Sequence, residues 1–255
     1  MKISITIAFI VLCATNLFAQ TADEIVQKAY LQSQGTSQYS QMTMQIIRPR
    51  WQKTMNFKIC SLGTDYSLVL VTEPAKDKGQ TFLKVKDQMW MWNPTINRSI
   101  KMGESMMSQG WMNSDYSNNE LLNSGSILKD YDKKIVATEN VSGKDCWAIE
   151  LVPKKGTNII WGKQKMWISK DGYLSLKTEF YDEDNELVKT FLASDIKTLG
   201  GRQIPTKYEI ITQDNLQNRT IVTLNNIIFD VKVQESFFTI QNMQKGMQIV
   251  FPQKN

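Results

Sequence analysis

Few residues in this chain have the types and spacing to carry out chemistry, and the sequence contains no histidine. Ser-His-Asp and Cys-His mechanisms are therefore excluded, and the commonest zinc and copper ligand is missing. Asp182, Asp184 and Glu186 in FYDEDNEL have the spacing of calcium ligands, but the glycine and distal glutamate of a helix-flanked calcium loop are absent. A solvated hairpin turn is the favoured interpretation. We expect a protein that is not an enzyme and uses no metal or cofactor.

The segment SIKMGESMMSQGWMNSDYSNNELL, residues 99–122, mixes methionine and tryptophan with glycine, serine and asparagine. Methionine packs adaptably against varied apolar shapes, whereas the polar neighbours argue against a buried strand. We interpret the part between about Gly103 and Asn123 as a lid, a loop with one or two short helices over an apolar cavity. The candidate ligand-binding residues of this lid are Met106, Met107, Trp111, Met112, Tyr116 and Leu121.

The motif MWMW at residues 89–92 makes both faces of a strand apolar. One face can belong to the core while the other lines the cavity. The sequence leaves open which face does which, and Trp90 and Trp92 are candidate cavity residues. Arg98, just before the lid, is a candidate contact for a ligand headgroup or for backbone carbonyls, with a plain surface position as the alternative.

The chain opens with MKISITIAFIVLCATNLFAQ, which has the positive start, short apolar run and small residue of a secretory signal peptide. Cleavage after Ala19 would remove residues 1–19 and leave 20–255 as one domain. A lipidated Cys13 is the rival interpretation, but Leu12 stands where lipid-attachment signals normally have a small residue. No later segment is long and apolar enough to span a bilayer, so we expect an exported, soluble protein.

Two cysteines, Cys60 and Cys146, remain after that cleavage. An exported protein can form a disulfide, but unpaired buried thiols are also common. Both outcomes stay open from the sequence.

The formal net charge is +5, and lysines are scattered among acidic residues, as in KDKGQTFLKVKDQ at 76–88. This pattern predicts a mixed solvated surface and no nucleic-acid groove. A mildly basic face would still favour the approach to anionic lipid headgroups.

One helix and a long series of antiparallel strands are predicted. TADEIVQKAYLQSQG begins with Thr21 as N-cap and Glu24 as its capping-box partner, and Gly35 ends it. Single strands are predicted for QYSQMTMQII, KTMNFKICSLG, DYSLVLVTEP, TFLKVKDQMWMWNP and WAIELVP, followed by hairpins over 163–229. Turn signals at short, even spacing predict an antiparallel meander, and therefore a sandwich or an open barrel.

Alternation along the strands predicts one apolar and one wet face. Leu174, Leu176 and Phe180 fall on one side, whereas Lys177 and Glu179 fall on the other. An apolar face of this size needs a cover. The N-terminal helix and the lid are the two covers that the sequence offers, and a gap between them would form an apolar cavity.

Eight stretches resemble a known family: EPAKDKGQTFLK, MWMWNPTINRSIKM, SMMSQGWMNSDYSNNELL, WAIELVPK, WGKQKMWISKDGYL, FYDEDNELVKTF, GGRQIPTKYEI and SFFTIQNM. They run in order across nearly the whole mature chain. The chain is similar to the LolA-like outer membrane lipoprotein-sorting proteins of Gram-negative bacteria, which share the LolA/RseB-type lipoprotein-binding fold. The resemblance implies a mainly β (α+β) fold, an incomplete antiparallel barrel covered by helices around a hydrophobic cavity.

The resemblance also implies a function. It suggests a periplasmic carrier that shields the acyl chains of lipoproteins, or another lipid, between an inner-membrane transporter and an outer-membrane acceptor. The alternative is an accessory or sensor subunit that docks on an inner-membrane transporter or receptor through the lid. The chain departs from the family at 112–116, where MNSDY replaces the usual Met-Gly-Ser-Asp-Phe. Because asparagine tolerates positive φ, a glycine-like turn is expected at Asn113.

Overall fold

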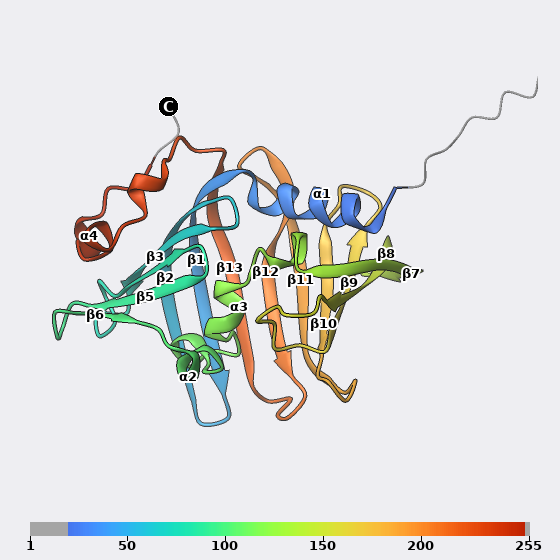
Figure 1. The fold of residues 1–255 in the computed structure, drawn as a ribbon, viewed down its shortest axis with the longest axis horizontal. Coiled ribbons are helices and arrows are strands. Elements are labelled where there is room, and N and C mark those ends of the chain that lie inside the picture. The colour runs from blue at the N-terminus through green and yellow to red at the C-terminus, as the bar shows by residue number, and fades with distance from the viewer. Residues whose placement is uncertain (1–19, 253–255) are drawn as a thin grey trace, which may run out of the picture.

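The computed structural model describes residues 20–252, so the predicted signal peptide and Cys13 lie outside the described residues (Figure 1). Helix α1, Ala22–Gln34, opens the described chain. The Thr21 hydroxyl accepts a hydrogen bond from the Glu24 N–H at 3.2 Å, and the Glu24 carboxylate accepts one from the Thr21 N–H at 3.1 Å. Gly35 follows the helix with φ +66°, a conformation that glycine adopts freely. The predicted capping box and helix end are confirmed.

The described chain contains thirteen strands. They are β1 Ser37–Arg48, β2 Trp51–Leu62, β3 Tyr66–Glu73, β4 Thr81–Val85, β5 Gln88–Asn93, β6 Arg98–Lys101, β7 Tyr131–Val141, β8 Lys144–Pro153, β9 Lys163–Ser169, β10 Ser175–Tyr181, β11 Leu187–Leu199, β12 Arg202–Thr212 and β13 Arg219–Phe229. All of them belong to one sheet, in the order β6-β5-β4-β3-β2-β1-β13-β12-β11-β10-β9-β8-β7. The sheet is antiparallel and does not close, because β6 and β7 are its two edges. The predicted incomplete barrel is confirmed.

The lid, residues 103–123, lies in the segment that connects the two edge strands. This segment contains α2 Glu104–Met107, the short 3₁₀ turn η1 Trp111–Asn113, α3 Asn118–Leu122 and η2 Ser126–Leu128. Figure 1 shows α1 lying across one end of the strands and the lid in front of the central strands. The two predicted covers, helix and lid, are therefore both present. We call the side of the sheet that faces them the inner face.

One predicted strand is in fact a hairpin. The stretch TFLKVKDQMWMWNP forms β4 and β5, which pair directly, with Val85 opposite Gln88. Lys86 adopts φ +55° in the tight turn between them. The turn residues, Lys86 and Asp87, include neither glycine nor proline, so the pattern resembled a single long strand.

The outer face of β2–β5 has a third cover, which the sequence did not predict. Residues 231–251 contain η3 Glu235–Phe237, α4 Ile240–Met243 and η4 Gly246–Gln248. Apolar side chains from this C-terminal segment, among them Phe238, Met243 and Phe251, pack with Cys60, Leu68, Leu83 and Trp92. Each helical piece spans only one turn, too short to produce a recognisable 3.6-residue period. Both faces of this half of the sheet are therefore apolar and covered.

The two cysteines lie in different parts of the core. Cys60 packs under the C-terminal segment, whereas Cys146 belongs to a separate cluster with Ala148 and Trp167. Both are buried and unpaired. Burial raises the pKa of the Cys60 thiol to about 12, so this side chain behaves as a small apolar residue.

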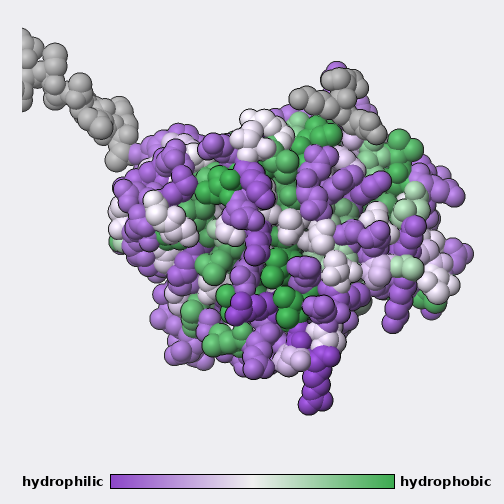
Figure 2. Space-filling view, turned by 180° about the vertical axis from the view of Figure 1, so that it is seen from behind, coloured by the Kyte–Doolittle hydropathy of each residue, from purple (hydrophilic) through white to green (hydrophobic). Residues whose placement is uncertain are grey.

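The surface is mixed in character, as predicted. Figure 2 shows hydrophilic side chains interleaved with scattered hydrophobic patches. The stretch 76–88 is only partly solvated, however, because Asp77 and Lys84 are buried. Asp77 pairs with Lys53 at 2.8 Å, and Lys84 faces inward from β4. None of the helices in the described part of the chain has the length and apolar character needed to cross a bilayer.

Candidate ligand-binding cavity

A cavity of about 390 Å³ lies between the inner face of the sheet, α1 and the lid. This volume falls in the range of about 300–1,000 Å³ that small-molecule sites typically have. The strands contribute a mostly apolar wall that includes Met42, Met44, Phe57, Ile59, Val69, Phe82, Met89, Phe191, Ile210 and Val222. Alternation along β1–β5 explains this wall, because one set of alternate residues faces the cavity and the other set faces the C-terminal segment.

Trp111 anchors the lid in this wall. Its ring lies 5.0 Å from the ring of Phe57 and 5.3 Å from that of Phe82, centroid to centroid. The side chain is buried, although its indole N–H has no hydrogen-bond partner among the described residues. Its backbone N–H donates to the Tyr116 carbonyl at 2.6 Å. The lid therefore folds back on itself around the buried Trp111 side chain.

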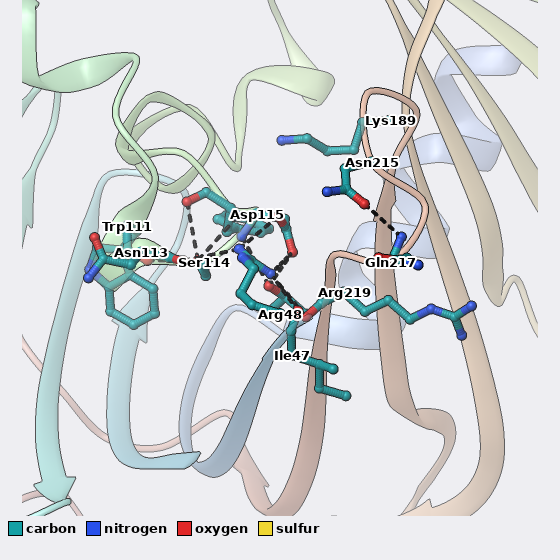
Figure 3. Close-up of polar contacts among 12 residues, drawn as sticks. Ile47, Arg48, Trp111, Asn113, Ser114, Asp115, Lys189, Asn215, Gln217 and Arg219 are labelled. Carbon is teal, nitrogen blue, oxygen red and sulfur yellow. Dashed lines mark hydrogen bonds and ion pairs between the residues drawn. The ribbon is translucent and has the colours of Figure 1, made fainter. Parts of the chain in front are cut away.

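An ion pair fixes the next turn of the lid to the sheet (Figure 3). Arg48 is the last residue of β1. Its two terminal guanidinium nitrogens donate to the two oxygens of the Asp115 carboxylate, at 2.9 and 3.1 Å. Arg48 also donates to the Asn113 carbonyl at 3.1 Å. The Thr220 hydroxyl donates to Asp115 at 2.7 Å and accepts from its N–H at 3.0 Å. Two strands, β1 and β13, therefore hold the turn that follows Trp111.

That turn has the backbone conformation expected from its sequence. Asn113 adopts φ +68° and Met112 adopts φ +54°. Both lie in the left-handed region, which asparagine tolerates better than most other residues. The glycine-like turn expected at Asn113 is therefore confirmed.

A second, buried ion pair holds α3. Glu120 and Ser117 form a capping box at the start of this helix. The same carboxylate accepts hydrogen bonds from the Lys189 ammonium at 3.0 Å on both oxygens. Both side chains are less than a tenth exposed. Lys189 extends from β11, so the lid is also tied to the other half of the sheet.

Two smaller cavities, of about 150 and 170 Å³, adjoin the main one. Phe191 lines all three. Tyr116 stacks on Phe191 at 5.5 Å and thereby separates the main cavity from the smaller one beside Glu120. Burial, with a smaller contribution from Glu120, raises the pKa of the Tyr116 hydroxyl, so this partition is uncharged.

The structure brings together some of the predicted site residues and separates others. Trp111, Tyr116 and Leu121 line the main cavity. Met106, Met107 and Met112 are half-buried and pack on the cluster beneath the lid. All six are lid residues, as predicted, and their contact with a ligand remains a prediction.

Three predicted residues lie elsewhere. Trp90 and Trp92 face the C-terminal segment on the outer face, so the alternative in which they line the cavity is wrong. Met89, on the opposite face of the same strand, lines it instead. Arg98 is exposed at the start of β6 and does not line the cavity. Alternation with period 2 correctly puts the two tryptophans of MWMW on one face of the strand and the two methionines on the other. It cannot say which of the two faces lines the cavity.

Arg48, next to the Pro49 turn between β1 and β2, is a lid-holding residue that the sequence alone does not reveal. The only signal for it was the acidic Asp115 in an otherwise neutral turn. A charge pair between segments this far apart in the chain cannot be recognised without the fold.

We expect Arg48→Ala to loosen the lid without unfolding the sheet. The change removes the hydrogen bonds that the guanidinium group donates to Asp115 and Asn113. A hydrogen bond that involves a charged group contributes about 1.5–3 kcal/mol to stability. Amide hydrogen exchange should become faster at residues 103–123 and stay slow in β1 and β13. Arg50→Ala, at the exposed hairpin tip, is the matched control. Equal protection of the lid in both variants would contradict the role of Arg48.

Comparison with known proteins assigns the fold to a class. A DUF1329 family protein from Desulfovibrio piger is 27% identical, with a TM-score of 0.77, covering 86% of this chain and 95% of that one. An outer membrane lipoprotein-sorting protein domain from Vibrio parahaemolyticus is 20% identical, with a TM-score of 0.76 over 88% and 98% of the two chains. A LolA superfamily protein from Nitrosomonas europaea is also 20% identical, with a TM-score of 0.74 over 88% and 99%. The protein therefore has the LolA-like fold.

A family model described as "-like: Uncharacterized protein" matches residues 63–245, more than half of the chain. The chain belongs to this family. No curated protein matches the sequence. The resemblance to LolA-like lipoprotein-sorting proteins is confirmed at the level of the fold.

Proposed function

We propose that this protein is a periplasmic carrier that shields the acyl chains of a lipoprotein or another lipid between the inner and the outer membrane. The observation that supports this most directly is the apolar cavity of about 390 Å³ under a lid. Burying an acyl chain gains about 0.8 kcal/mol per CH₂, so a dry cavity with a movable cover is sufficient for binding. The function then consists of sequestration and hand-over, without covalent chemistry.

The lid favours a carrier over an accessory or sensor subunit that docks through its methionines. Met106, Met107 and Met112 pack on the apolar cluster beneath them, and Trp111 is buried between two phenylalanines. The apolar side of the lid therefore faces the sheet. A docking surface would need that side to face solvent.

A cavity-filling variant tests the proposal. Val222 lines the cavity from β13, whereas Thr223 follows it on the same strand and faces the other side of the sheet. We expect Val222→Trp to lose co-purifying lipid and uptake of a fluorescent fatty acid, because the added ring occupies the space of the acyl chain. Thr223→Trp should keep both.

Lipid mass spectrometry on protein purified from the exporting cell gives the primary measurement, and thermal unfolding verifies that both variants fold. If the wild-type protein carries no lipid or lipoprotein and takes up no fatty acid, the carrier function is wrong. Equal lipid content in the two variants would instead place the binding site outside this cavity.

A further inference from the structure

One wall of the cavity carries a buried positive charge. Lys84 points inward from β4 and is 7% exposed. Among the described residues that line the cavity, it is the only charged one. Its ammonium group donates one hydrogen bond, to the Thr64 carbonyl at 2.6 Å. An ammonium has three N–H donors, so two remain without a protein partner in the described chain.

Lys84 differs from the other buried lysines in having no counter-ion. Lys189 contacts both oxygens of Glu120 at 3.0 Å. Lys133, with a side chain only 2% exposed, pairs with Asp23 at 2.7 Å. No described carboxylate lies within 4.0 Å of the Lys84 ammonium. The carboxylate of nearby Asp65 pairs instead with the Lys129 ammonium, at 4.0 Å. Burying an unpaired charge is unfavourable, so its position at a cavity wall requires an explanation.

Polar groups surround Lys84 at this end of the cavity. We call Tyr30, Gln34, Gln38, Ser61, Ser67 and Lys84 the polar end. Ser67 lies opposite Lys84 in the sheet. The Gln38 side chain donates to Gln34, and its own oxygen is buried without a hydrogen-bond partner among the described residues. The polar end therefore offers both unused donors and an unused acceptor.

The apolar wall continues directly from the polar end. Phe82 lies two residues before Lys84 on the same face of β4, opposite Val69. Its ring contacts that of Trp111 under the lid. A chain that starts at Lys84 would pass over Phe82 and Val69 and end at Trp111. The cavity therefore has one charged end and one apolar end.

We infer that the cargo is an amphiphile with an anionic group at the head of its acyl chain, and that Lys84 binds this group. The inference rests on the proposed function and narrows its cargo. A carboxylate or a phosphate would supply the missing counter-ion and accept the two unused hydrogen bonds. The esterified chains of a lipoprotein carry no such charge at this position.

Amphiphiles of matched chain length test this inference: laurate, lauroyl lysophosphatidate and the neutral monolaurin, titrated calorimetrically below their micelle concentrations. We expect the wild type to bind at least one anion more tightly than monolaurin. Lys84→Met should weaken that anion about 10- to 100-fold and leave monolaurin nearly unchanged. Lys197→Met, which removes the same charge from an exposed position, should change none of the three affinities.

Thermal unfolding separates a ligand role from a structural one. If Lys84 serves the ligand, Lys84→Met should keep or raise the melting temperature, because an unpaired buried charge is removed. A lower melting temperature with equal loss of all three ligands would show that Lys84 only supports the Thr64 loop, and would overturn the inference. So would equal affinity of the wild type for anions and monolaurin. Failure of all three ligands to bind would instead contradict the carrier function itself.

The pH dependence gives an independent measurement. Burial lowers the pKa of Lys84 to about 8, a shift that Asp65 opposes and Lys129 adds to. Tyr30, the tyrosine of the polar end, has a raised pKa and stays neutral in this range. Lys84 is therefore cationic at about pH 7 and largely neutral at about pH 9. Laurate should bind more weakly at the higher pH in the wild type, and Lys84→Met should abolish this dependence.

Discussion

Trp111→Ala is expected to destabilise the protein by about 3–5 kcal/mol, the usual cost of removing a buried aromatic side chain. The ring fills the space between Phe57 and Phe82, and the lid has few other apolar contacts as large. Its removal leaves a cavity that neither the sheet nor the short lid helices can close. The measurement is urea unfolding with the midpoint and slope compared to wild type. Ligand uptake should fall as well, because the lid loses the aromatic contacts that hold it against the sheet.

Trp51→Ala is the matched control for this change. Trp51 is 46% exposed, and Arg48 approaches its ring in a cation–π contact, 5.8 Å from the centroid. Such a contact at an exposed site contributes at most about 1 kcal/mol. Similar destabilisation in the two variants would mean that Trp111 is not the anchor of the lid.

Breaking the buried ion pair from either side should cost about 3–5 kcal/mol, because each single change strands a buried charge. Lys189→Met leaves Glu120 without its cation, and Glu120→Gln leaves Lys189 without its anion. The double variant removes both charges, and its glutamine oxygen can still accept from Ser117. It should therefore be markedly more stable than either single variant.

A double-mutant cycle in urea measures this coupling. The exposed pair Lys197 and Asp195, at 3.9 Å, provides the comparison. Removing either of its charges should change stability by no more than about 0.5 kcal/mol. Additive effects of the Glu120 and Lys189 changes would show that the two groups stabilise the lid independently.

Local patterns were sufficient for much of this fold. Thr21, Glu24 and Gly35 specified the helix because capping is decided within one turn of the chain. The strands of the second half followed from alternation, as in β10, where Leu176 and Phe180 are buried and their neighbours less so. The lid was predictable because its methionines and Trp111 stand among polar residues, a mixture typical of a cover.

The remaining features depend on contacts between distant segments. MWMW gave two apolar faces, but the cover of the outer face comes from residues far away in the chain. The C-terminal segment provides one of these covers through Phe238 and Phe251, in pieces too short to show a period. Charged residues were misjudged for the same reason. The lysines of residues 76–88, Lys84 among them, were predicted to lie on a solvated surface, because burial of a charge is visible only when its partners, or their absence, are known.

The central position of the β1–β13 pair determines when the protein can fold. The other strand pairs of the described sheet are hairpins or near neighbours in the chain, which form quickly, whereas β1 and β13 come from opposite ends of it. Pairing of such distant strands is slow because the loop between them must first be closed. Until then β1 and β13 are both open edges, prone to pair with other chains. Because Met44 and Val222, direct partners across this pair, both line the cavity, we expect the cavity to be completed only when this slow pairing has occurred.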